Sequence, residues 1–89
     1  MIERKIIVSN QLGLHARATA KLVQLLAPYD SSVTLKAKGR EVNGKSIMGV
    51  MLLAAGMGTE IDLRVEGADE AEVAHAVVDL FERKFDEES

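Results

Sequence analysis

The sequence has no cysteine, no tryptophan and only one proline, and aromatic residues make up 3% of its 89 residues. Without cysteine, neither a disulfide bond nor a thiolate metal site can stabilise the fold, and the absence fits a reducing compartment. Apolar residues still make up 47% of the chain. We therefore expect a single domain over residues 1–89, with a core of aliphatic side chains.

Long apolar runs and an excess of positive charge are also missing. No stretch approaches the ~20 apolar residues of a membrane span, and residues 1–5 do not begin the apolar segment of a signal peptide. The formal net charge is -3 at pH 7, whereas nucleic-acid binding requires clustered cations. We expect a cytoplasmic protein that neither inserts into membranes nor binds nucleic acid.

Hydrophobic periodicity predicts seven elements in the order βαββαβα. Strands are expected at residues 2–8, 33–37, 40–42 and 61–65, and helices at residues 16–27, 47–53 and from about residue 69 onward. Alternating strands with one polar face favour an antiparallel sheet whose other face is covered by helices. The predicted fold is α+β, an open-faced β-sandwich in which three helices cover one face of a four-stranded antiparallel sheet.

Three local features complete this prediction. The first helix should end before Pro28 and bury one stripe of its surface, widened by three leucines (Ala16, Ala20, Val23 and Ala27, with Leu22, Leu25 and Leu26). Asp69 and Glu72 have the spacing of a capping box at the start of the last helix. The acidic residues 86–88 are expected to form a frayed tail.

The segment Gly13-Leu14-His15-Ala16-Arg17 places a histidine at the mouth of the first predicted helix. A helix start offers unpaired N–H groups and the positive end of the helix dipole, which favour an anion such as phosphate. The same dipole disfavours imidazolium, so we expect a neutral imidazole with a free lone pair. Arg17 adds a planar cation suited to phosphate oxygens. A surface histidine near a helix cap remains the alternative.

A second segment, Gly39-Arg40-Glu41-Val42-Asn43-Gly44-Lys45-Ser46, matches the nucleotide-binding pattern G-x-x-x-x-G-K-[ST]. Its chemistry would place backbone amides and Lys45 around phosphates and Ser46 on magnesium. The short following helix and the antiparallel strand pattern argue against it, because such domains need several parallel strands. We expect a hairpin through Gly39 instead.

The residues around the second predicted helix allow several roles. Ser46 is a suitable N-cap, and as a phosphorylation site it would carry a dianion where a helix N-terminus tolerates it. Some of the apolar side chains that follow should be exposed, and methionine suits surfaces that meet several partners (Ile47, Met48, Met51, Leu52 and Leu53). On the last helix, Glu72, His75 and Asp79 share a face, which we interpret as a solvated surface and not as a metal site.

Taken together, Gly13-Leu14-His15-Ala16-Arg17 and Val42-Asn43-Gly44-Lys45-Ser46-Ile47-Met48-Gly49 resemble the histidine-containing phosphocarrier proteins (HPr) of the bacterial phosphotransferase system. The resemblance spans essentially the whole chain. It implies a carrier that is a substrate of other enzymes and needs no cofactor. Enzyme I would phosphorylate Nδ1 of His15, and enzyme IIA domains would receive the phosphoryl group.

The resemblance also assigns roles to the neighbouring residues. Arg17 would neutralise phosphate charge, and the N–H groups of Ala16 and Arg17 would contact its oxygens. A dedicated HPr kinase/phosphorylase would modify Ser46 and weaken docking to enzyme I. The docking surface would include Ala20, Ile47 and Met48, and the carrier would be a monomer.

Two features of the match point to different branches of the family. Residues 10–13 and 85–88 look like the nitrogen-type branch, which serves regulation, whereas the Ser46 segment looks like the kinase-regulated sugar branch. Ala18 stands where many members have proline, a residue that suits the first helical turn but is not needed for the chemistry. Three other classes remain to be compared with the structure: a small ATPase, an interaction module without phosphoryl chemistry, and an RNA-binding sheet.

Overall fold

The computed structural model describes residues 1–87 and has the predicted order of elements. The strands are β1 (Ile2–Ile7), β2 (Ser32–Ala37), β3 (Arg40–Asn43) and β4 (Glu60–Glu66). The helices are α1 (Ala16–Leu26), α2 (Ile47–Leu52) and α3 (Glu70–Glu82), followed by a short turn, η1 (Lys84–Asp86). All strand pairings are antiparallel, in the order β1-β4-β2-β3. The α+β fold with a four-stranded open sheet and three helices is confirmed.

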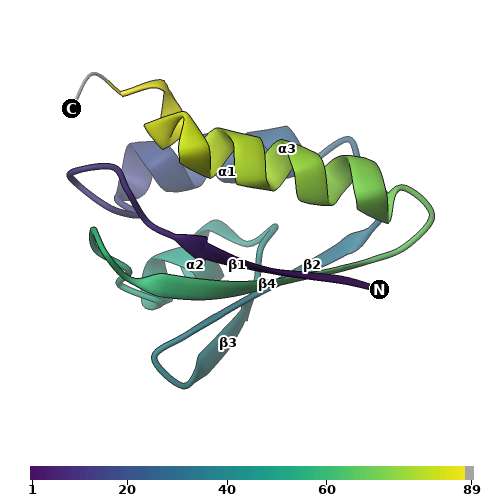
Figure 1. Cartoon of the computed structure of the whole chain (residues 1–89), viewed down its shortest axis with the longest axis horizontal. Helices are drawn as coiled ribbons and strands as arrows, with labels where there is room; N and C mark the ends of the chain where they lie inside the picture. The colour runs from purple at the N-terminus through teal and green to yellow at the C-terminus, as the bar shows by residue number, and fades with distance from the viewer. Residues whose placement is uncertain (88–89) are drawn as a thin grey trace.

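The core lies between the sheet and the two long helices. Figure 1 shows α1 and α3 on the same face of the sheet, and α2 packs against α1 and β3. In β4, Ile61, Leu63 and Val65 alternate with exposed polar residues and are buried. Aliphatic side chains supply most of the core, and Phe81 and Phe85 meet edge to face at its end, with ring centroids 4.8 Å apart.

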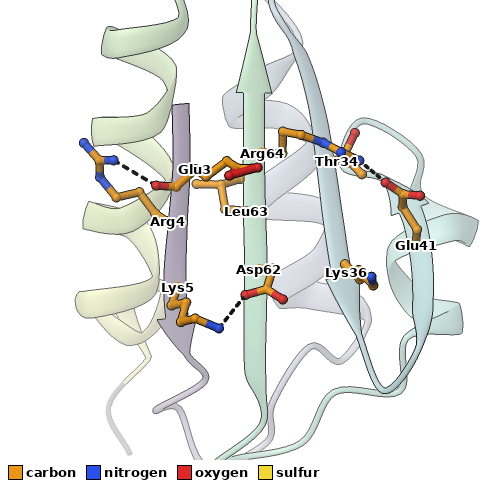
Figure 2. Close-up of a pocket in the computed structure, with 9 residues that line it drawn as sticks. All are labelled: Glu3, Arg4, Lys5, Thr34, Lys36, Glu41, Asp62, Leu63 and Arg64. Carbon is orange, nitrogen blue, oxygen red and sulfur yellow. Dashed lines mark hydrogen bonds and ion pairs between the residues drawn. The ribbon is translucent and has the colours of Figure 1, made fainter. Parts of the chain in front are cut away.

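The opposite face of the sheet is open and carries charges of both signs (Figure 2). Lys5 donates hydrogen bonds to Glu60 at 3.0 Å and to Asp62 at 3.2 Å, and Arg64 pairs with Glu41. Four of these side chains help to line a shallow hollow of about 550 Å³ (Lys5, Glu41, Asp62 and Arg64). Exposed ion pairs stabilise the fold by only about 0–1 kcal/mol, and the positive and negative side chains on this face nearly balance in charge. We therefore interpret this face as a solvated surface. None of the four strands carries the aromatic side chains on which bases stack.

The hairpin between β2 and β3 shows why the nucleotide-binding pattern does not form a phosphate loop. Ala37 pairs with Arg40, so Lys38 and Gly39 alone make the turn, and both have positive φ angles, 55° and 76°. Two such residues are typical of a tight hairpin turn. The residues that would surround phosphates, 40–43, are instead paired with β2. Lys45 donates to the backbone oxygen of Tyr29 at 2.6 Å.

The face that α1 buries differs from the predicted stripe. The buried residues are Ala18, Thr19, Leu22 and Leu26, whereas Ala16 and Ala27 are exposed. Alanine is apolar but too small to define a face, so leucine burial decides the orientation of the helix. The prediction was wrong for Ala16 and Ala27 and is confirmed for Leu22 and Leu26. The other three predicted residues are half-buried (Ala20, Val23 and Leu25).

The capping box at the start of α3 is also absent. Asp69 precedes α3 but makes no side-chain bond to that helix. Its carboxylate accepts the hydroxyl of Ser31, the N–H of Ser31 at 2.9 Å and the N–H of Asp30 at 3.0 Å. This contact fastens the α1–β2 loop to the β4–α3 loop, a tertiary interaction that local spacing cannot indicate.

These bonds predict how stability depends on pH. The Ser31 hydroxyl, with the two N–H groups, holds the pKa of Asp69 below its ordinary value. A group whose pKa is lower in the folded state stabilises the fold at pH values above its unfolded pKa, and this stability is lost as the pH falls through the folded pKa. We expect Asp69→Asn to lower the melting temperature at pH 7 and to flatten its acid dependence below about pH 4. Thermal melts between pH 2 and 7 test this.

The exposed carboxylate of Glu82 supplies the control. Glu82→Gln removes the same charge without touching the two loops and should leave the acid limb of the melting curve as in the wild type. An equal flattening in both variants would contradict the assignment to Asp69.

Candidate functional site

His15 occupies the N-cap position of α1. Its backbone is extended (φ -76°, ψ 179°), and its carbonyl accepts the first helical bond, from the N–H of Thr19 at 2.9 Å. The N–H groups of residues 16–18 therefore precede the first residue that has a helical acceptor. They add to the positive end of the helix dipole beside the histidine. The structure thus confirms the helix start that the sequence indicated.

The loop before α1 is fixed against a distant part of the chain. Gly13 has a φ of +67°, and a Cβ there would lie 2.4 Å from the oxygen of Ala55 and 2.7 Å from Cα of Gly56. The N–H of Leu14 donates to the same Ala55 oxygen at 2.8 Å, and the Leu14 side chain is buried. Glycine is required here both by the backbone angle and by the lack of space.

The imidazole of His15 contacts the other end of the chain. Its Nε2 is bonded to the carboxylate of Glu87, and the other Glu87 oxygen accepts Nδ2 of Asn10 at 3.0 Å. The expectation of a frayed tail is therefore wrong for Asp86, which pairs with Arg83, and for Glu87. Glu88 lies outside the described residues. Acidic composition alone gave no signal for this contact.

The charge of Glu87 determines which imidazole nitrogen is free. Burial raises the pKa of Glu87, but the hydrogen bonds from Asn10 and His15, with the charge of Lys21, outweigh it and hold the pKa below its ordinary value. An ionised carboxylate only accepts hydrogen bonds, so Nε2 must be the protonated nitrogen. In the neutral ring, Nδ1 then carries the lone pair.

Arg17 is the second residue of α1 and follows the histidine by two positions. It is exposed and lines a hollow of about 330 Å³ together with Leu12, His15 and Glu87. A nucleophilic nitrogen, unpaired helix amides and a guanidinium are thus assembled at one helix end. Such an arrangement can accept a phosphoryl group and stabilise its charge.

The second motif forms the cap of α2. The Ser46 hydroxyl accepts the N–H of Gly49 at 3.0 Å, which confirms the predicted N-cap. Four apolar side chains of α2 are exposed, by 47%, 73%, 42% and 57% (Ile47, Met48, Met51 and Leu52), whereas Leu53 is buried. Ala20 on α1 is half-buried. Because α2 packs against α1, these apolar side chains lie on a helix adjacent to the one that His15 caps.

The structure also bears on possible metal binding and membrane insertion. Glu72, His75 and Asp79 are exposed on α3, and the described part of the chain contains no cluster of three or more potential ligands that could hold a metal ion. Within residues 1–87, no helix combines the length and the apolar character that crossing a membrane requires.

A histidine at a helix start, beside an arginine, is chemically suited to accept a phosphoryl group, and comparison with known proteins identifies the family. The sequence model described as "PTS HPr component phosphorylation site" matches residues 2–83. The chain is 57% identical to the phosphocarrier protein HPr of Xylella fastidiosa strain 9a5c, with 100% of both chains covered. The chain belongs to the HPr family.

Solved structures agree with this assignment. The crystal structure of HPr-C-His from Thermoanaerobacter tengcongensis is similar over 100% of both chains, with a TM-score of 0.95 and 43% identity. A structure described as an HPr dimer from the same organism covers 98% of this chain and 100% of its own, with a TM-score of 0.78 and 42% identity. The protein is therefore a phosphocarrier of the phosphotransferase system and acts as a carrier, not as a catalyst.

The geometry of the loop before α1 gives a prediction for Gly13. Gly13→Ala must adopt a left-handed backbone and also displace the backbone at residues 55–56. We expect it to destabilise the fold by at least about 1–3 kcal/mol, which lowers the melting temperature by roughly 5–15 °C in a domain of this size. Thermal unfolding followed by circular dichroism measures the effect.

Two other glycines separate the causes. Gly39 has a φ of +76° but open space around it, and Gly56 has open space and no positive φ. Gly39→Ala should therefore show the backbone cost alone, and Gly56→Ala should show neither. If Gly13→Ala melts no lower than Gly39→Ala, the close approach to Ala55 does not constrain the loop.

Proposed function

We propose that Nδ1 of His15 is the atom that receives the phosphoryl group from enzyme I and passes it to an enzyme IIA domain. The observation that carries this proposal is the bond between Nε2 and Glu87, which leaves the Nδ1 lone pair available at the start of α1. A nitrogen nucleophile splits one difficult transfer into two easier steps. The carrier itself then needs no cofactor or metal.

Arg17 and the first-turn amides are proposed to stabilise the transferred group. The N–H groups of Ala16 and Arg17 precede the first helical hydrogen bond of α1, so they are available to phosphate oxygens. The guanidinium of Arg17 can make charge-assisted bonds, about twice as strong as neutral ones. Because Arg17 is exposed, it can reach the phosphoryl group during its transfer between two proteins.

Partner docking is proposed for the apolar surface that Ala20, Ile47 and Met48 provide. The exposed fractions of Ile47 and Met48, 47% and 73%, are large for apolar side chains. Exposed apolar residues that gather in one place are typical of a protein–protein contact, and methionine adapts to more than one partner. The same surface could therefore serve enzyme I and enzyme IIA in turn.

Ser46 is proposed as a regulatory phosphorylation site for an HPr kinase/phosphorylase. Its oxygen already accepts the N–H of Gly49 at the start of α2, so a phosphate there would keep a favourable electrostatic position. Phosphorylation would place a dianion next to exposed Ile47 and Met48. A partner that docks on these apolar side chains would then have to desolvate that charge.

We further propose that the carrier works as a cytoplasmic monomer. The apolar side chains of α2 remain exposed on the single chain, which suits exchange between successive partners. The downstream acceptor belongs either to sugar uptake or to nitrogen-type regulation, and the neighbouring genes distinguish these branches. Light scattering of the purified protein tests the monomer.

The acceptor is tested by labelling with phosphoenolpyruvate and enzyme I. We expect an acid-labile, base-stable phosphoryl group on the wild type and none on His15→Ala. His75→Ala is a matched control, because His75 is the other histidine and is exposed on α3; it should be labelled like the wild type. Label on His15→Ala would refute the proposal. If the His15→Ala variant kept the biological function of the wild type, that result would favour a pure interaction module.

The switch is tested with Ser46→Asp. The carboxylate can still cap α2, so circular dichroism should stay native while phosphoryl acceptance from enzyme I slows by roughly tenfold, because the added charge opposes docking. Ser46→Ala is the control: it loses a cap of about 1 kcal/mol but adds no charge, and its acceptance rate should stay near that of the wild type. Equal rates for all three proteins would count against the switch.

A further inference from the structure

The end of the described chain is held over the histidine by several independent contacts. Lys21 of α1 donates to the backbone oxygen of Phe85 at 2.6 Å, and the Phe85 side chain is fully buried. Nδ2 of Asn10 bridges the oxygen of Gly13, at 2.8 Å, and the carboxylate of Glu87. These contacts connect Glu87 to both the loop before α1 and the helix itself.

The backbone of this segment adopts a conformation that brings Glu87 back toward α1. Lys84, Phe85 and Asp86 have φ angles of 55°, 57° and 60°, values that residues other than glycine rarely adopt. Glu87 then lies with its side chain only 13% exposed, against His15, whose side chain is 26% exposed. A carboxylate so enclosed is held in place and does not merely lie near the ring.

Glu87 lies outside the family match, which ends at residue 83. The acceptor motif at residues 13–17 therefore does not by itself indicate a carboxylate on Nε2. Two charged side chains, those of Arg17 and Glu87, line the 330 Å³ hollow beside the imidazole of His15. Arg17 suits the phosphoryl oxygens, whereas Glu87 contacts Nε2.

We propose that Glu87 is a positioning residue for phosphoryl transfer, which fixes the proton on Nε2 of His15 and stabilises the positive charge that the ring acquires. This inference rests on the proposed role of His15. The arrangement is the same in kind as a carboxylate that orients a histidine through its second ring nitrogen in metal sites and catalytic triads.

The step balances without any proton transfer. The Nδ1 lone pair forms the bond to phosphorus, and the bond between phosphorus and the donor atom breaks, with its electron pair leaving on the donor. The ring keeps the proton on Nε2 and gains one positive charge, shared by both nitrogens. The carboxylate of Glu87 faces this charge through the hydrogen bond to Nε2. In delivery to the acceptor, the same charge is lost as the nitrogen–phosphorus bond breaks.

Two measurements on each variant test the proposal. The ¹⁵N shifts of the His15 ring report which nitrogen is protonated, and the rate of labelling from phosphorylated enzyme I reports transfer. Phosphoramidate, a small phosphoryl donor, repeats the rate measurement without any docking protein. A merely structural role of Glu87 would leave the ring tautomer unchanged.

Glu87→Ala removes the acceptor, and Glu87→Gln keeps the shape but removes the charge. We expect Glu87→Ala to populate the Nδ1-protonated form and to slow labelling from both donors by roughly tenfold, as for other residues that orient a histidine. Glu87→Gln should give an intermediate loss, because a neutral hydrogen bond is weaker. Asp86→Asn is the matched control: Asp86 is exposed and pairs with Arg83 at 2.7 Å, so both measurements should match the wild type.

The possible results are distinct. If Glu87→Ala keeps the wild-type tautomer and is labelled within twofold of the wild-type rate, the positioning role is wrong. If Asp86→Asn slows labelling as much as Glu87→Gln, the effect is one of net charge and the role is again wrong. If His15→Ala is labelled as well as the wild type, it is the proposed acceptor that fails.

Discussion

The close approach of Gly13 to the backbone of residues 55–56 is the contact on which the position of His15 depends. The N–H of Leu14 meets the Ala55 oxygen at 2.8 Å, and only glycine has both the space and the backbone freedom to precede it. This contact joins the β1–α1 loop to the segment before β4, so the start of α1 is fixed by a part of the chain some forty residues away. His15 follows directly, and its orientation is therefore set by packing and not by the helix alone.

The packing of α2 against α1 places the residues of the other proposed functions on a helix adjacent to the one that His15 caps. Val50 is the residue that α2 buries, and one anchor on so short a helix leaves the other apolar side chains exposed. In a protein with no partner, this exposure would be unfavourable by about 25 cal/mol for each Å² of apolar surface. A carrier that must bind and release successive proteins needs such a surface, and Ser46 at the helix start is suitably placed to change its charge.

The sequence predicts those features that depend on neighbours along the chain. The alternation in β4, the hairpin through Gly39 and the Ser46 cap are all local, and each is observed. The predictions failed where distant contacts decided the outcome. Asp69 bonds to the α1–β2 loop instead of capping α3, and α1 leaves Ala16 and Ala27 of the predicted stripe exposed.

The candidate site divides in the same way. His15 and Arg17 were indicated by their spacing at a helix start, because a helix places its first residues at a predictable end of its dipole. Spacing in the sequence could not identify Glu87, because no periodicity links it to a histidine seventy-two residues earlier. Its only signal was Phe85, an apolar residue close to an acidic end, which the structure buries completely.

Burial of Phe85 also explains how an unfavourable backbone can persist beside the histidine. Left-handed geometry costs roughly 1–2 kcal/mol for each residue other than glycine, and three such residues follow one another. Burying a phenylalanine contributes about 1.5–3 kcal/mol, and the bond from Lys21 to the Phe85 oxygen adds to it. The free energy of packing thus offsets much of the conformational cost of placing a carboxylate on Nε2.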